Sequence, residues 1–118
     1  MVLVDTSVWI QHLRAGEPKL SALLADGLVV MHPFVLGELA CGNLKDRATI
    51  LSSLGSLPAA QLATHAEVLW LIEDSKLSGR GLGWTDVHLL ASSLLSPCEF
   101  WTLDKRLFAA ASELGLTR

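Results

Sequence analysis

Four carboxylate side chains stand at positions from which they could reach one site: Asp5, Glu38, Asp86 and Asp104. Asp5 and Asp104 each follow an apolar run, "VLV" and "FWTL", that is typical of a buried strand. Oxygen ligands of this kind suit Mg²⁺ or Mn²⁺, and a divalent ion removes the repulsion between neighbouring carboxylates. Such an ion could bind phosphate oxygens, activate water and stabilise a departing oxygen. The four residues therefore predict a metal site that could hydrolyse phosphate esters.

The elements expected around these residues form a mixed α/β fold. Strands are expected over 2–5, 28–32 and 99–104, and helices over 7–14, 18–26, 33–41, 45–54, 64–77, 86–95 and 105–113. The segment 57–62 fits either a short edge strand or a loop. Because helices separate the strands, the sequence predicts a central, mainly parallel sheet in a three-layer α/β/α domain spanning residues 1–118. In such sheets function gathers beyond the carboxyl ends of the strands, where Asp5 and Asp104 are expected.

Each carboxylate, taken alone, also has a purely structural interpretation. An aspartate after a strand, such as Asp5, often forms a turn or a cap, and Asp104 could cap the helix that follows it. Asp86 would complement the positive end of its own helix, for which Thr85 is the predicted N-cap. Glu38, about one turn into a helix, could be a solvated surface residue. The four acidic positions together, at one sheet edge and in this order, support a shared site better than any one of them does.

The composition predicts a chain with a large core and no membrane-spanning segment. Hydrophobic residues make up 51% of the 118 residues and the mean hydropathy is +0.45, yet no 18-residue stretch lacks charges and turn residues. No secretory signal is expected at the N-terminus, and Cys41 and Cys98 have no motif spacing. We therefore expect two buried free thiols in the reducing cytoplasm. The net charge of −3 argues only weakly against a nucleic-acid partner. If the four candidate ligands are set aside, the chain has nine basic and eight acidic residues.

Four segments of the sequence resemble the motif blocks of one protein family. They are "VLVDTSVWI" (2–10), "LGELACG" (36–42), "GLGWTDVHLLASS" (81–93) and "FWTLDKRLFAAASELGL" (100–116). These blocks resemble PIN-domain proteins, and more closely the short single-domain VapC-type toxins of bacterial toxin–antitoxin pairs. The resemblance covers nearly the whole chain, and the order and spacing of the acidic blocks are more specific than any single motif.

The resemblance implies a reaction for the four carboxylates. In this family the acidic residues of these blocks coordinate Mg²⁺ or Mn²⁺ and cleave RNA by hydrolysis. It nominates Asp5 and Asp86 as the principal metal ligands, with Glu38 assisting directly or through a water and Asp104 completing the pocket. The activity that this implies is a metal-dependent endoribonuclease, the toxin of a toxin–antitoxin pair, which leaves a 5′-phosphate and a 3′-hydroxyl.

The same resemblance implies two protein partners. Toxins of this type form homodimers through helices and bind an antitoxin whose C-terminal segment lies across the active-site groove. The helices within 7–25 and 33–54 are the candidate surfaces for these contacts. Such partners would also account for the high apolar content of the chain.

Other residues near the acidic blocks could contact phosphate or RNA. The hydroxyls of Thr6 and Ser7 follow the first carboxylate, and Arg80 lies in "GRGLG", which lacks the Walker pattern and more simply ends a helix. Trp84 lies beside the third acidic position and could stack on an unpaired base. Trp70, on an apolar helix, is expected in the core instead.

Two other functions are weighed against the ribonuclease. A small Mg²⁺-dependent phosphohydrolase could use the same acidic edge through a phosphorylated Asp5, but "VDTSV" lacks the second aspartate that the haloacid dehalogenase type requires. A catalytically silent PIN-like scaffold that binds RNA or protein would fit the same fold. Against the scaffold, all four acidic positions are present and none is replaced by an amide.

Overall fold

The strands of the computed structural model form a parallel sheet at its centre. The structure describes residues 1–96 and 98–117. In this part of the chain β1 (Val2–Val4) lies between β2 (Val29–Val30) and β3 (Glu99–Trp101), in the order β2-β1-β3. Both neighbours run parallel to β1, and Val2 is in register with Val29 on one side and Glu99 on the other. The central parallel sheet predicted from the sequence is confirmed.

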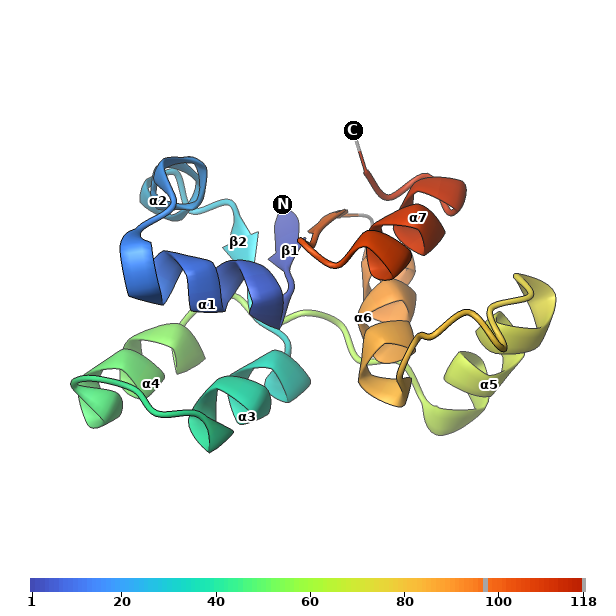
Figure 1. The fold of residues 1–118 in the computed structure, drawn as a ribbon, viewed down its shortest axis with the longest axis horizontal. Coiled ribbons are helices and arrows are strands. Elements are labelled where there is room, and N and C mark those ends of the chain that lie inside the picture. Colours follow the sequence, from blue (N-terminus) through green and yellow to red (C-terminus); the bar gives the residue numbers. More distant parts are fainter. Residues whose placement is uncertain (97, 118) are drawn as a thin grey trace.

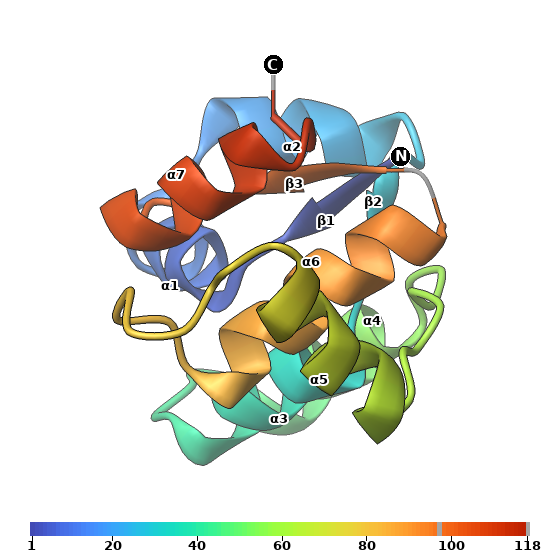
Figure 2. The ribbon, with the colours of Figure 1, turned by 90° about the vertical axis from the view of Figure 1, so that its right-hand side faces the viewer.

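Helices surround this sheet on both faces. Those in the described residues are α1 (Thr6–Ala15), α2 (Pro18–Ala25), α3 (Pro33–Cys41), α4 (Arg47–Gly55), α5 (His65–Asp74), α6 (Trp84–Leu95) and α7 (Lys105–Glu113). Figure 1 shows α1 to α4 on one side of β1 and α5 to α7 on the other. In Figure 2 the strands lie between α2 and α7 above and α3 to α6 below, which gives three layers. None of the helices described is both long and apolar enough to cross a membrane.

The sheet is apolar because both of its faces are covered. Leu3 and Val4 of β1 are fully buried, and Phe100 of β3 is almost completely buried. Each neighbouring layer contributes side chains to the same core, including Leu89 of α6 and Leu107 of α7. The central strand is therefore a rigid support for the residue that follows it, Asp5.

Two strands are shorter than the sequence predicted. β2 is limited to Val29–Val30, and Met31 continues the pairing only as a single parallel bridge to Ala59. The segment 57–62, for which the sequence fits either a strand or a loop, thus pairs with the end of β2 only through this bridge. β3 ends at Trp101 rather than at Asp104, because the chain turns there toward α7.

The start of α6 differs from the prediction. The helix begins at Trp84 with Gly83 as its N-cap, so the expected cap, Thr85, lies inside the first turn. The carboxylate of Asp86 accepts a hydrogen bond from the backbone N–H of Gly83 at 2.8 Å, which satisfies a donor at the helix start. Asp86 is therefore close to the positive end of this helix, as expected.

Two burial predictions are wrong. Trp70 is 64% exposed, because α5 packs on α6 through Val68 and Leu71 and turns the indole outward. Cys41 is exposed at the last position of α3, and Cys98 is half-buried. Both cysteines are free thiols, as predicted.

Candidate active site at the carboxyl edge of the sheet

Asp5 lies where β1 ends and α1 begins, and only 7% of it is exposed. Its side chain makes no capping hydrogen bond to α1, unlike a typical aspartate at this position. Oδ2 instead accepts hydrogen bonds from the hydroxyls of Ser7, at 2.7 Å, and Thr102, at 2.8 Å. The carboxylate is therefore held in one orientation at the carboxyl edge of the sheet.

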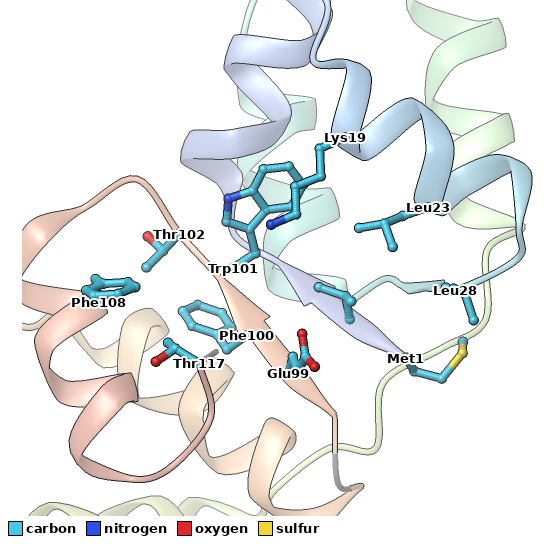
Figure 3. Close-up of a pocket in the computed structure, with 11 residues that line it drawn as sticks. Met1, Lys19, Leu23, Leu28, Glu99, Phe100, Trp101, Thr102, Phe108 and Thr117 are labelled. Carbon is cyan, nitrogen blue, oxygen red and sulfur yellow. The ribbon is translucent and has the colours of Figure 1, made fainter.

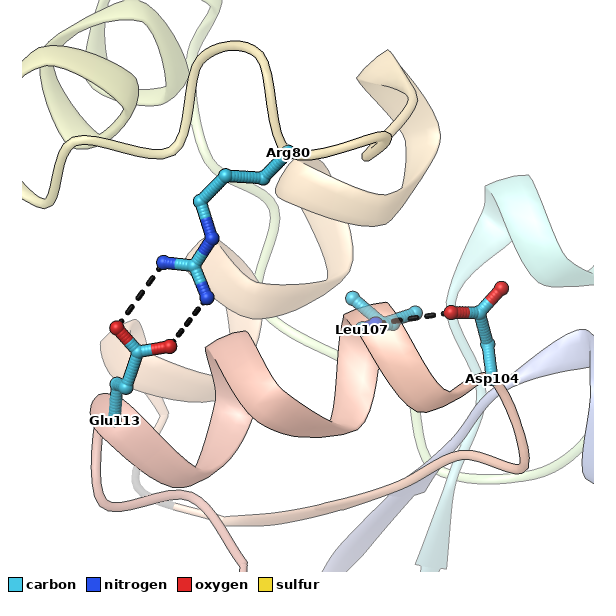
Figure 4. A network of polar contacts seen from close by, with 4 residues as sticks. All are labelled: Arg80, Asp104, Leu107 and Glu113. Atoms are coloured by element: carbon cyan, nitrogen blue, oxygen red, sulfur yellow. Dashed lines mark hydrogen bonds and ion pairs between the residues drawn. The ribbon is translucent and has the colours of Figure 1, made fainter.

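Thr102 connects Asp5 to Asp104. Its hydroxyl donates to Asp5 and accepts a hydrogen bond from the backbone N–H of Asp104 at 3.0 Å. Asp104 is exposed, and its Oδ1 caps α7 by accepting from the N–H of Leu107 at 2.9 Å (Figure 4). Thr102 was not predicted from the sequence. The available signal was a hydroxyl two residues before Asp104, the aspartate expected to end the last strand.

Glu38 is bound to the first turn of α1. It is exposed on α3, and its Oε1 accepts a hydrogen bond from the Thr6 hydroxyl at 2.6 Å. The Ser7 hydroxyl, besides its bond to Asp5, accepts from the N–H of Leu103 at 3.0 Å. Thr6 and Ser7 thus support carboxylates in this structure. Contact of either hydroxyl with a phosphate stays a prediction.

Asp86 lies under the electrostatic influence of the other three carboxylates. Partial burial is the main factor that raises its pKa above the ordinary aspartate value, and the hydrogen bond from Gly83 lowers it. The negative charges of Asp5, Asp104 and Glu38 raise this pKa further. The fold therefore brings all four sequence-predicted carboxylates, from four separate segments, near one location.

The donor atoms at this location fit a hard divalent cation, because all four side chains offer only oxygen. Within residues 1–96 and 98–117, however, no three Asp, Glu, His or Cys side chains are gathered closely enough to hold one ion. In Asp86 and in Asp104, one carboxylate oxygen accepts a hydrogen bond from a backbone N–H. In Glu38, one carboxylate oxygen accepts a hydrogen bond from a hydroxyl. Metal binding would thus require the more exposed side chains to rotate toward Asp5.

Arg80 and Trp84, the predicted RNA contacts, have different surroundings. The Arg80 guanidinium makes a two-pronged ion pair with Glu113 of α7 (Figure 4), so a phosphate would have to compete for it. Trp84 is 39% exposed on the first turn of α6 and contacts the rings of His65 and His88. Trp84 therefore remains open to a ligand, whereas Arg80 is already paired.

Two of the cavities in the described part of the chain lie beside Glu38 and beside β3. One, of about 500 Å³, opens beside Glu38 between α1, α3, the segment after α3 and α4. It is lined by the cationic side chains of Arg14 and Lys45 and by the carboxylates of Glu38 and Asp46. The other, of about 310 Å³, lies over β3 between α2 and α7, where the Lys19 amine is 4.9 Å from the ring centroid of Trp101 (Figure 3). Only the first cavity includes one of the four carboxylates. Its two cations are matched by two carboxylates, so the lining as a whole carries no excess positive charge.

Comparisons with known proteins agree with this architecture. A family model described as "PIN domain" matches residues 2–114. The chain is 48% identical over 117 residues to Ribonuclease VapC32 of Mycobacterium tuberculosis, in strains CDC 1551 / Oshkosh and ATCC 25618 / H37Rv, covering 98% of this chain and 94% of the relative. The crystal structure of FitAcB from Neisseria gonorrhoeae matches with a TM-score of 0.66 and 19% identity, over 95% of this chain and 94% of that one.

The likeness to FitAcB concerns the fold alone, because the identity is low. The likeness to VapC32 is much closer and extends over nearly the whole of both chains. Together with the family match over residues 2–114, it confirms the resemblance found in the sequence blocks. The chain belongs to the PIN-domain family, and within that family it is similar to the VapC-type ribonucleases.

Proposed function

We propose that this chain is a metal-dependent endoribonuclease, which hydrolyses RNA phosphodiesters at a site formed by Asp5, Glu38, Asp86 and Asp104. The observation that carries the proposal is the buried Asp5 at the carboxyl edge of the sheet, oriented by two hydroxyls, with Asp86 close enough for the charges of Asp5, Asp104 and Glu38 to raise its pKa. The 48% identity to a protein named a ribonuclease supports the same reaction here. It also favours the ribonuclease over the small phosphohydrolase.

The proposed cofactor is Mg²⁺ or Mn²⁺. Asp5 and Asp86 would be its principal ligands, Glu38 would contribute directly or through a water, and Asp104 would complete the set. When bound, such an ion supplies positive charge that activates water and stabilises the departing oxygen. The products would be a 5′-phosphate and a 3′-hydroxyl.

The residues of this chain would prepare the site in two ways. The hydroxyls of Ser7 and Thr102 hold Asp5 in place before substrate arrives, which lowers the cost of ordering the site during the reaction. The raised pKa of Asp86 means that it ionises at a higher pH than an exposed aspartate. Since a metal ligand must be ionised, activity should fall in acid as Asp86 takes up a proton.

We also propose that the chain acts in the cytoplasm as a toxin, binds a cognate antitoxin and forms a homodimer. The support is its similarity to VapC-type proteins. Sedimentation of the purified chain would test the dimer. A small reading frame encoded upstream, with a DNA-binding N-terminus, would support the antitoxin. Its absence would favour RNA processing outside a toxin–antitoxin pair.

The test of the reaction is cleavage of mixed cellular RNA by the purified chain, with Mg²⁺ or Mn²⁺ and with EDTA. Asp5→Asn and Asp86→Asn should both abolish cutting, because each removes a negative charge that would hold the cation. Asp26→Asn is the matched control. Asp26 is exposed between α2 and β2, at the opposite edge of the sheet, so this variant should cut like the wild type.

The outcomes separate the proposed functions. Cutting that needs metal and disappears only in the two site variants supports the ribonuclease. Equal cutting by all forms means that the site is misplaced or that the activity is a contaminant. A folded, antitoxin-free chain that never cuts RNA would favour the catalytically silent scaffold.

A further inference from the structure

We propose that a row of aromatic rings beside the carboxylates binds the unpaired bases of single-stranded RNA. This inference rests on the proposed function and adds the kind of RNA and the residues that hold it. The row, which we name the ring row, joins the starts of α3 and α5 to the first two turns of α6. Its members, in spatial order, are His32, Phe34, His88, Trp84 and His65.

The ring row is continuous. His88 lies at its centre, 4.7 Å from Phe34 and 4.9 Å from Trp84 between ring centroids. His65 extends it 4.9 Å beyond Trp84, and His32 extends it 5.0 Å beyond Phe34. The planes of successive rings differ by 49° to 79°, so no two of them form a parallel stack. The rings therefore support one another largely through their edges.

The ring row contains both buried rings and rings that are partly exposed to solvent. His32 is fully buried and His88 is 8% exposed, whereas Phe34 is 38% and Trp84 39% exposed. The two larger rings thus present area to solvent on either side of a buried imidazole. Trp70 is more exposed but makes no ring contact among the described residues. A supported, partly exposed pair of rings is the arrangement that a stacking ligand requires.

The ring row adjoins the candidate active site. Trp84 shares the face of α6 on which His88 lies, whereas Asp86, two residues after Trp84, projects from a different side of the helix. Phe34 precedes Glu38 by four residues on α3, and residues four apart lie on the same face of a helix. A nucleotide whose base stacks on Phe34 would therefore place its phosphate close to Glu38, and Trp84 would hold a neighbouring base across His88.

The chemistry of the row selects unpaired bases. Every base has a flat π-face, so stacking on an aromatic side chain tolerates any sequence. In an A-form duplex these faces are already stacked on neighbouring pairs and are out of reach. The net charge of −3 also limits the general attraction to phosphate. We therefore expect stacking on Phe34 and Trp84 to supply a large share of the affinity.

The test is the affinity for a fluorescently labelled single-stranded RNA of mixed sequence, measured in EDTA so that no cleavage interferes. Phe34→Leu and Trp84→Leu should each raise the Kd about 10-fold, because each removes one stacked base. Trp70→Leu is the matched control and should leave the Kd unchanged. Trp84→Phe keeps a ring and should retain most of the affinity, which separates lost stacking from lost folding. A duplex of the same sequence should bind the wild type more weakly.

Several results would overturn the ring row as an RNA surface. One is an unchanged Kd for RNA in Phe34→Leu and Trp84→Leu, and another is an equal rise of the Kd in Trp70→Leu. The others are a duplex that binds as tightly as the single strand, and a folded wild type that binds no RNA. The cleavage assay keeps the two proposals apart. Metal-dependent cutting with unchanged binding in the ring variants removes only this inference. Ring-dependent binding without cutting removes only the ribonuclease.

Discussion

At the scale of single residues, the hydroxyl of Thr102 is the feature on which two carboxylates depend. Thr102→Val keeps the side-chain shape but removes the donor to Asp5 and the acceptor for the N–H of Asp104. We expect metal affinity or cleavage to fall about 10- to 100-fold, as is usual when a supporting hydrogen bond to a metal ligand is lost. Titration with Mn²⁺ and the cleavage rate would measure this. Thr102→Ser keeps the hydroxyl and should stay near wild type, and a valine variant as active as the serine variant would refute the role.

His32 makes stability depend on pH, again at the residue scale. Burial lowers its pKa from 6.5 to about 4, and the charge of His88 adds to the effect. An unfolded chain takes up this proton below about pH 6.5, whereas the folded chain takes it up only near pH 4. The stability contributed by the neutral imidazole is therefore complete above pH 6.5 and is lost as the pH falls toward 4.

The substitution His32→Asn tests this dependence. The His32 Nδ1 accepts the N–H of Phe34 at the start of α3, and asparagine can replace it as an N-cap without titrating in this range. We expect the variant to be less stable at neutral pH, because a buried ring is lost, yet to lose less stability between pH 6.5 and 4 than the wild type. Urea unfolding over a pH series would measure both. An unchanged slope with pH would mean that other groups titrate in this range.

At the scale of elements, α5 depends on a reciprocal pair of hydrogen bonds at its start. The Thr64 hydroxyl accepts from the N–H of Glu67 at 3.1 Å, and the Glu67 carboxylate accepts from the N–H of Thr64 at 2.8 Å. Thr64→Ala should lower the free energy of unfolding by about 1 kcal/mol, measured by urea unfolding. Thr49→Ala, at an exposed position of α4, is the control and should have little effect. Equal effects of the two changes would show that the cap is not the cause.

The elements also show which features a sequence can predict. The start of α5 was predicted to within one residue from its apolar spacing, and Thr64 with the glutamate three residues later is a second local signal for it. The start of α6 was not, because Gly83 has no side chain that marks a cap. The lengths of β2 and β3 depend on pairing between distant segments, which no local pattern encodes.

The residues of the site also differ in whether a local sequence pattern could predict them. Asp5, Glu38, Asp86 and Asp104 could be nominated because each occupies a recognisable place in a strand–helix order. Thr102 and the ring row could not, since they depend on contacts such as that between Phe34 and His88, which join different helices.

At the scale of the whole molecule, the four carboxylates come from four segments that are far apart in the sequence. Asp5 follows the central strand, and the other three lie on α3, on α6 and at the start of α7. A cation bound by them would therefore connect both sides of the sheet. Without it, the charges of the other three carboxylates act against ionisation of Asp86. Folding stability and metal binding should thus be linked.

This linkage predicts that Mg²⁺ or Mn²⁺ raises the melting temperature of the wild type. A ligand that binds only the folded state at 100 times its Kd adds about 2.7 kcal/mol to the free energy of unfolding. Asp5→Asn should lose most of this gain, whereas Asp26→Asn, at the opposite edge of the sheet, should keep it. The measurement is thermal unfolding with the metal and with NaCl of equal ionic strength, which separates binding from screening. If both salts act alike, or if Asp5→Asn gains as much as the wild type, the cation is not held by this site.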